Sequence, residues 1–169
     1  YDIVIARMEP ENNIEMILKG FIHSKKDRDL VIIGSLETKF GQYLSNKYQD
    51  KKIKYLGFVS GLDKLNSLRY FSNLYFHGHS VGGTNPSLLE AMASDSLICA
   101  HDNIFNKSIL DKDAYYFANS EQISDLINNK IKAKENEFVI DNRNKISDLY
   151  SWQKIVTDYN SFFVQILYK

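Results

Sequence analysis

The stretch HGHSVGGTNPSLLE, residues 77–90, decides how this chain is expected to fold. It follows a short apolar run, Leu74–Phe76, and leads into residues whose apolar side chains recur at helical spacing. It therefore predicts a strand, a glycine-rich loop and a helix in that order. Pro86 suits the first turn of this helix, because the N–H that proline lacks has no helical partner there. Such a unit is typical of a parallel sheet covered by helices.

Apolar runs alternate with amphipathic segments on both sides of this stretch. The other expected strands are residues 1–7, 30–33, 53–56, 97–100 and 115–118. The alternation predicts an α/β fold with a Rossmann-like parallel sheet flanked by helices, as one domain over residues 1–169. A wide apolar stripe between Trp152 and Leu167 is expected to pack either on this sheet or on another domain.

Composition narrows the classes of function. Hydrophobic residues make up 44% of the chain and charged residues 25%, which is typical of a folded globular protein. The 21 basic and 21 acidic residues cancel, so nothing favours nucleic acid as a partner, and an anion site has to be local. The single cysteine, Cys99, excludes an internal disulfide. Because an expected core strand begins at Tyr1, without an initiator methionine, we expect a fragment of a longer protein.

The glycine-rich loop is a candidate anion site. Ligands of open parallel sheets bind at the carboxyl ends of the strands, where this loop begins. Gly82 and Gly83 let the backbone approach a ligand closely, and the N–H groups at the start of the following helix favour an anion. Asn85 and Ser87 add short polar side chains, so a diphosphate fits the loop. The alternative is an ordinary tight turn in which Asn85 caps the helix.

Two charged residues are expected near this loop. Glu90 lies about one turn into the helix, close to its apolar face, and a ribose diol would supply the donors that such a carboxylate needs. The alternative is a glutamate bonded to a neighbouring loop or exposed. Arg7 ends the first strand, and its guanidinium matches phosphate oxygens. The alternative for Arg7 is a surface arginine at a strand end.

Two segments together resemble a known family. They are RMEPENNI, residues 7–14, and GGTNPSLLEAMA, residues 82–93. The pair is similar to the retaining GT-B glycosyltransferases called family 4, and the resemblance covers the whole chain, including YLGFV at 55–59 and YSW at 150–152. It matches the C-terminal, nucleotide-sugar (donor) binding domain of that family, one half of a GT-B fold. The GGTNPS version looks most like transferases of capsule or O-antigen synthesis, including rhamnosyltransferases.

The resemblance implies site residues, position by position. Glu90 matches the glutamate that binds the ribose hydroxyls, and Gly57, Phe58 and Val59 match the segment that lines the base pocket. The donor sugar is expected beside His79 and Gly82. The residues implied at the donor diphosphate are Arg7, Gly83, Thr84, Asn85, Ser87 and Leu88.

This chain departs from the family pattern at two positions. The first glutamate of the E-x7-E signature, a ligand of the donor sugar, is replaced by Gly82. The lysine that often joins the arginine on the diphosphate is replaced by Asn12. The second change removes a positive charge, which predicts weaker nucleotide binding or another cation from elsewhere. His79 is close enough in sequence to compensate.

The resemblance also implies partners and limits. A nucleotide-diphosphate sugar (UDP, GDP or dTDP) is expected as donor, with no cofactor. The acceptor domain, N-terminal and absent from this chain, is expected to supply part of the catalytic machinery. We therefore expect the isolated chain to bind nucleotide without transferring sugar. A cytoplasmic location with peripheral contact at the inner face of the membrane is expected as well.

Several alternatives stay open at this stage. A metal site of His77 and His79 with His101 or Asp102 is disfavoured, because the family needs no metal and no cysteine or glutamate cluster stands nearby. A nucleotide-sugar epimerase could share the same GT-B half. A non-catalytic nucleotide-binding module would fit the change at Gly82, and a flavodoxin-like interaction domain would bind no nucleotide.

Overall fold

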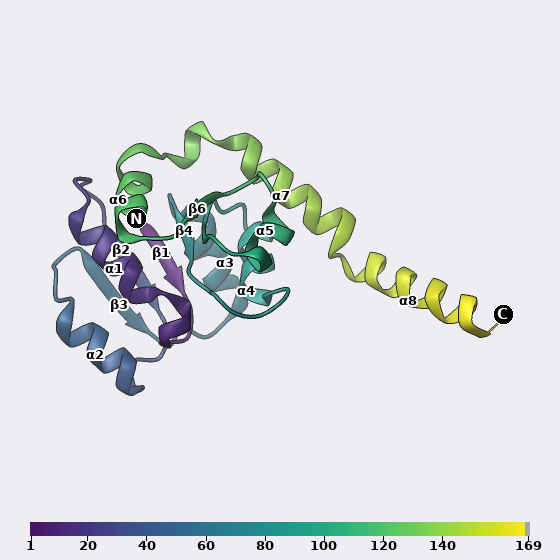
Figure 1. The fold of residues 1–169 in the computed structure, drawn as a ribbon, viewed down its shortest axis with the longest axis horizontal. Helices are drawn as coiled ribbons and strands as arrows, with labels where there is room; N and C mark the ends of the chain where they lie inside the picture. Colours follow the sequence, from purple (N-terminus) through teal and green to yellow (C-terminus); the bar gives the residue numbers. More distant parts are fainter. Residues whose placement is uncertain (168–169) are drawn as a thin grey trace.

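A computed structural model describes residues 1–167, and its centre is a six-stranded parallel sheet (Figure 1). The strand order is β3-β2-β1-β4-β5-β6, and each neighbouring pair is parallel. This confirms the predicted α/β fold. The strands are β1 (Asp2–Ile5), β2 (Leu30–Ile33), β3 (Ile53–Gly57), β4 (Tyr75–His77), β5 (Ile98–His101) and β6 (Tyr115–Phe117).

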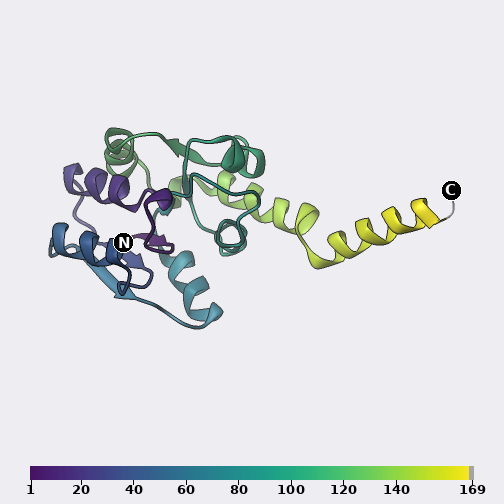
Figure 2. The ribbon, with the colours of Figure 1, turned by 60° about the horizontal axis from the view of Figure 1, so that its bottom comes forward.

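Helices cover both faces of the sheet, as Figures 1 and 2 show. The helical elements are η1 (Pro10–Asn12), α1 (Ile14–His23), α2 (Lys39–Lys47), α3 (Leu62–Phe71), α4 (Pro86–Ala93), α5 (Ile104–Leu110), α6 (Ser120–Asn129), η2 (Lys132–Lys134), α7 (Asn136–Leu149) and α8 (Trp152–Leu167). Apolar residues of α1, α2 and α6 share one buried cluster, and those of α3, α4 and α5 share another. The result is a three-layer domain with a core on each side of the sheet.

The strand order reverses between β1 and β4, where the chain moves from one half of the sheet to the other. At such a switch point the loops that leave the two strands diverge, and a crevice opens at their carboxyl ends. The loop after β1 carries Arg7, and the loop after β4 is the glycine-rich stretch. The topology therefore brings these two segments to the same edge.

Two helices were not predicted from the sequence, α5 and α7. In α5 only the second half provides apolar core residues, Ile109 and Leu110. Two neighbouring residues do not form a helical repeat that can be recognised in the sequence. In α7 the core contacts of Val139 and Ile146 are separated by polar ones. The buried Asn142 donates through Nδ2 to the Asp113 carbonyl at 2.7 Å, and Lys145 Nζ lies 2.6 Å from the Asp113 carboxylate. A helix fixed in this way leaves no clear hydrophobic period.

The last helix, α8, extends away from the sheet (Figures 1 and 2). None of its residues is buried, and Trp152 is 82% exposed. The apolar stripe expected between Trp152 and Leu167 is present, but it does not pack on this sheet. Within residues 1–167, no helix combines the length and apolarity that a membrane span requires.

Candidate functional site

The loop after β1 is tied to the loop after β4 through Asn12 and Asn13. The buried Asn12 side chain donates through Nδ2 to the Arg7 carbonyl at 2.8 Å. Asn13, at a φ of 50°, donates through Nδ2 to the Gly78 carbonyl at 2.8 Å. A Cβ on Gly78 would lie 2.1 Å from the Asn12 carbonyl oxygen, so only glycine fits there. Asn12 stands where the resemblance implies a lysine, and its side chain holds the backbone of this loop in place.

The glycine-rich loop is also held from its other side, by the loop after β5. Asn103 and Asn106 donate through Nδ2 to the His79 carbonyl, at 2.9 and 3.2 Å. The Ser80 N–H and hydroxyl both donate to the Glu11 carbonyl, at 3.0 and 2.8 Å. The sequence analysis missed Asn103 and Asn106, for which the only local signal is an N-cap asparagine ahead of α5.

Arg7 is exposed at this edge. Its side chain is 83% exposed, and its ion pair with Glu9, at 3.3 Å, is a surface pair of small stabilising value. Burial lowers the pKa of His79, and the positive charge of Arg7 lowers it further. The loop that carries Arg7 is tied to the glycine-rich loop through Asn13 and Glu11, and the exposed guanidinium is available to a ligand.

The start of α4 combines a closed cap with open donors. Asn85 Oδ1 accepts from the Ser87 N–H at 2.9 Å, and the Asn85 carbonyl accepts from the Leu88 N–H at 3.0 Å. An anion at Ser87 or Leu88 has to compete with this cap. In residues 1–167, the N–H groups of residues 82–85 make no hydrogen bond within the protein. The open donors for a phosphate therefore lie just upstream of the helix.

Glu90 has a protein partner that the sequence analysis missed. Its Oε2 accepts from Nη2 of Arg69 on α3 at 2.6 Å, and the Glu90 side chain is 40% exposed. The Arg69 side chain is 1% exposed. The sequence signal for this buried arginine is its position just after Leu65 and Leu68, two apolar residues of α3 that pack toward the core.

The rings of His77 and His79, at the start of the glycine-rich stretch, stack with their centroids 4.2 Å apart. His77 is buried, and neither of its ring nitrogens has a hydrogen-bond partner in residues 1–167. Burial holds the pKa of His77 well below its usual value, and the neighbouring His79 ring and the Arg69 cation lower it further. His77 is therefore a neutral ring at neutral pH. No group of three or more His, Cys, Asp or Glu side chains within the described residues could hold a metal ion.

The segment expected at the base lies at the end of β3. Gly57 has a φ of 67°, and its carbonyl accepts from the Gly34 N–H at 2.9 Å. Val59 packs against the core, whereas Phe58 is 79% exposed. Phe58 is thus an apolar surface at the carboxyl edge of the sheet.

These features define a Rossmann-like α/β domain whose carboxyl edge carries an exposed arginine and open N–H groups, followed by a helix with a glutamate held by a buried arginine. The chain belongs to the family described as Glycosyl transferases group 1, which matches residues 2–148. A search of curated proteins gives no significant match.

Solved structures share the fold, although their sequences are distant. The C-terminal domain of a glycosyl transferase group 1 family protein (LpcC) from Francisella tularensis has a TM-score of 0.70 at 20% identity, covering 90% of this chain and 87% of that one. Sucrose-phosphate synthase from Thermosynechococcus elongatus has a TM-score of 0.79 at 12% identity, covering 98% and 45%. HepE from Anabaena, in complex with UDP-glucose, has a TM-score of 0.77 at 12% identity, covering 97% and 48%.

The share of each solved chain that is covered shows how much of it this chain matches. The chain spans nearly the whole LpcC domain but less than half of the sucrose-phosphate synthase and HepE chains. Its fold is that of a C-terminal domain of GT-B glycosyltransferases.

Proposed function

We propose that this chain is the donor-binding half of a retaining glycosyltransferase of family 4, and that it binds the nucleoside diphosphate of a nucleotide sugar. One observation carries the proposal. The loops after β1 and β4 leave the sheet at its switch point and carry Arg7 and the open N–H groups of residues 82–85, and Glu90 lies about one turn into the helix that follows the second loop. A structural neighbour, HepE, is solved with UDP-glucose, which supports a nucleotide sugar as ligand.

The diphosphate would lie between Arg7 and the glycine-rich loop. An arginine–phosphate contact contributes about 1.5–3 kcal/mol, and a helix N-terminus about 0.3–1 kcal/mol. Negative charge develops on the departing diphosphate, so these groups bind more strongly in the transition state than in the ground state. Asn12 adds no charge, because its amide is neutral, and the Asn12 side chain already donates to the Arg7 carbonyl. We therefore expect a dissociation constant between about 1 μM and 1 mM.

Glu90 and the end of β3 would bind the nucleoside. Glu90 is exposed enough to accept from ribose hydroxyls while one of its oxygens stays on Arg69. Gly57, Phe58 and Val59 would line the base, with the exposed ring of Phe58 as its apolar surface. His79 and Gly82 would lie beside the donor sugar, where the family's first glutamate is missing.

The rest of the reaction lies outside these residues in the proposal. An N-terminal acceptor domain would complete the active site, so the isolated chain would bind nucleotide without transferring sugar. The resemblance supports a saccharide or lipid-linked acceptor, a role in capsule or O-antigen synthesis, and a cytoplasmic enzyme at the inner face of the membrane.

Calorimetric titration of the chain with UDP, GDP and dTDP tests the proposal. We expect one of the three nucleotides to bind best, and we expect Glu90→Ala to lower the affinity for it about tenfold to a hundredfold. Glu121→Ala, an exposed glutamate in the first turn of α6, is the matched control and should leave the affinity unchanged. If none of the three binds at millimolar concentration, the proposal is wrong; an unchanged affinity in a folded Glu90→Ala variant removes Glu90 from the site.

A further inference from the structure

Arg69 is a buried cation on a helix face that otherwise contributes to the core. Its side chain is 1% exposed, while Leu65 and Leu68 of the same helix pack against the core of this face. Burying a guanidinium is unfavourable unless it is paired and hydrogen-bonded. An apolar residue would fill the position at lower cost, so the contacts of Arg69 are the feature to explain.

Those contacts hold the guanidinium from several directions. Nη1 donates to Asn66 Oδ1 at 2.9 Å, and Nη2 donates to Glu90 Oε2 at 2.6 Å and to Ser87 Oγ at 3.5 Å. The guanidinium carbon lies 6.0 Å from the centre of the Tyr75 ring, and the Tyr75 hydroxyl is 2.9 Å from Ser87 Oγ. Arg69 is therefore a fixed point that joins α3, β4 and the first turn of α4.

Glu90 differs from Arg69 in its exposure. The carboxylate is 40% exposed, and within residues 1–167 it is bound through Oε2 alone, so Oε1 remains open to a ligand. An unpartnered glutamate on a helix surface samples several rotamers, and fixing one has an entropic cost. A short charge-assisted bond to a buried arginine removes that freedom before any ligand arrives.

We infer that Arg69 is a positioning residue of the nucleotide site: it holds the Glu90 carboxylate in the orientation that receives the pentose hydroxyls of the nucleotide. The inference rests on the proposed function. Arg69 itself lies beneath the surface and would not contact the ligand. Its bond to Ser87 is long, at 3.5 Å, whereas its bond to Glu90 is short, at 2.6 Å, so its removal should act chiefly on the contacts that Glu90 makes. The base and diphosphate contacts should remain.

Arg69→Met tests this with two probes. The first is the nucleoside diphosphate that binds best among UDP, GDP and dTDP, and the second is its 2′,3′-dideoxy analogue, which offers Glu90 no hydroxyl. We expect Arg69→Met to weaken the first about tenfold and to change the second by less than about twofold. The double variant Arg69→Met/Glu90→Ala should bind the first probe no more weakly than Glu90→Ala alone, because both changes remove one interaction.

Arg69→Lys provides a second variant in case the methionine disrupts folding. One ammonium cannot reproduce the fork that spans Asn66 and Glu90, so we expect about a threefold loss, again for the first probe only. Equal losses for both probes, or additive effects in the double variant, would overturn the inference. If Arg69→Met does not fold and Arg69→Lys binds the nucleotide with unchanged affinity, the inference is also overturned, because Arg69 would then serve folding alone. If the wild-type chain binds none of the nucleotides, the proposed function fails instead.

Discussion

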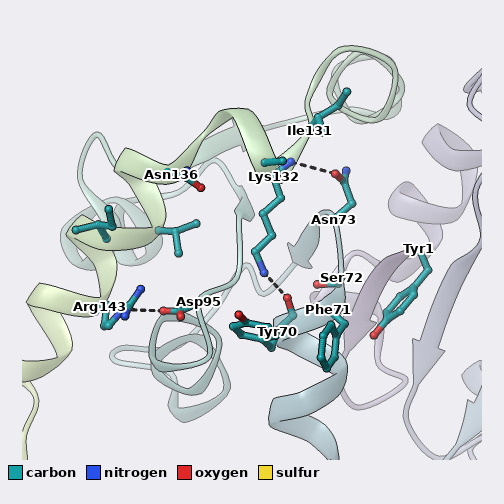
Figure 3. A pocket seen from close by; sticks show the side chains of 13 residues that line it. Tyr1, Tyr70, Phe71, Ser72, Asn73, Asp95, Ile131, Lys132, Asn136 and Arg143 are labelled. Atoms are coloured by element: carbon teal, nitrogen blue, oxygen red, sulfur yellow. Dashed lines mark hydrogen bonds and ion pairs between the residues drawn. The ribbon is translucent and has the colours of Figure 1, made fainter.

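The two edges of the sheet use their charged residues in opposite ways. At the amino edge lies a pocket of about 570 Å³, lined in part by Tyr70, Asp95, Lys132 and Arg143 (Figure 3). Both cations are engaged there: Arg143 Nε lies 2.8 Å from Asp95 Oδ1, and Lys132 Nζ donates to the Tyr70 carbonyl. Each of these cations therefore already has a partner within the protein, which leaves less of its charge for a ligand.

The carboxyl edge has its binding groups open. Arg7 is 83% exposed and makes only a surface ion pair, and the N–H groups of residues 82–85 have no partner within residues 1–167. The surrounding backbone is nevertheless held by Asn13, Asn103 and Asn106. Unused hydrogen-bonding groups on a fixed backbone therefore mark the carboxyl edge as the candidate site, although the larger pocket lies at the amino edge.

The largest effect is expected from Gly78→Ala, which tests whether the loops at the carboxyl edge are locked together. The new Cβ would lie 2.1 Å from the Asn12 carbonyl oxygen, and we expect a loss of about 3 kcal/mol in the free energy of unfolding. Gly83→Ala is the control, because a Cβ there meets nothing within 4 Å. Urea denaturation of both variants measures the difference. Equal stabilities would mean that the two loops are not locked.

The next effect compares a cation from each edge. Arg7→Ala should weaken nucleotide binding about tenfold to a hundredfold, because the diphosphate loses a charge-assisted contact. Arg143→Ala removes a cation of the amino-edge pocket and should leave nucleotide affinity unchanged. Calorimetric titration of both variants decides the matter. A greater loss for Arg143→Ala would move the site to the other edge.

The smallest effect concerns His77, the buried member of the stacked histidine pair. Burial lowers the pKa of His77 in the folded chain, so below about pH 6.5 the unfolded chain binds more protons than the folded one. Stability should therefore fall as the pH drops from about 7 to 5, by at most about 1.4 kcal/mol per pH unit for this group. His77→Gln should reduce that slope in denaturation experiments across this range. An identical slope would show that His77 is not kept neutral by the fold.

Much of the fold was predictable from local patterns. The runs at β2 and β5 read as strands because both faces of a central parallel strand are buried, and α4 was marked by Pro86 and its apolar spacing. In contrast, α5 and α7 were missed because short apolar contacts and polar anchors hold them. The direction of α8, away from the sheet, was not settled by its apolar stripe either.

For the candidate site, the amino-acid sequence alone determined which groups meet at one edge. Parallel strands end on the same side, so the residues after β1 and β4 converge there whatever their other contacts. Only the tertiary structure decided what those residues touch. Glu90 pairs with Arg69, and Asn103 and Asn106 hold the glycine-rich loop at His79. The partners in these hydrogen bonds are 21 to 27 positions apart in the chain. The packing of α3, α4 and α5 sets such pairings, and no local pattern of residues encodes them.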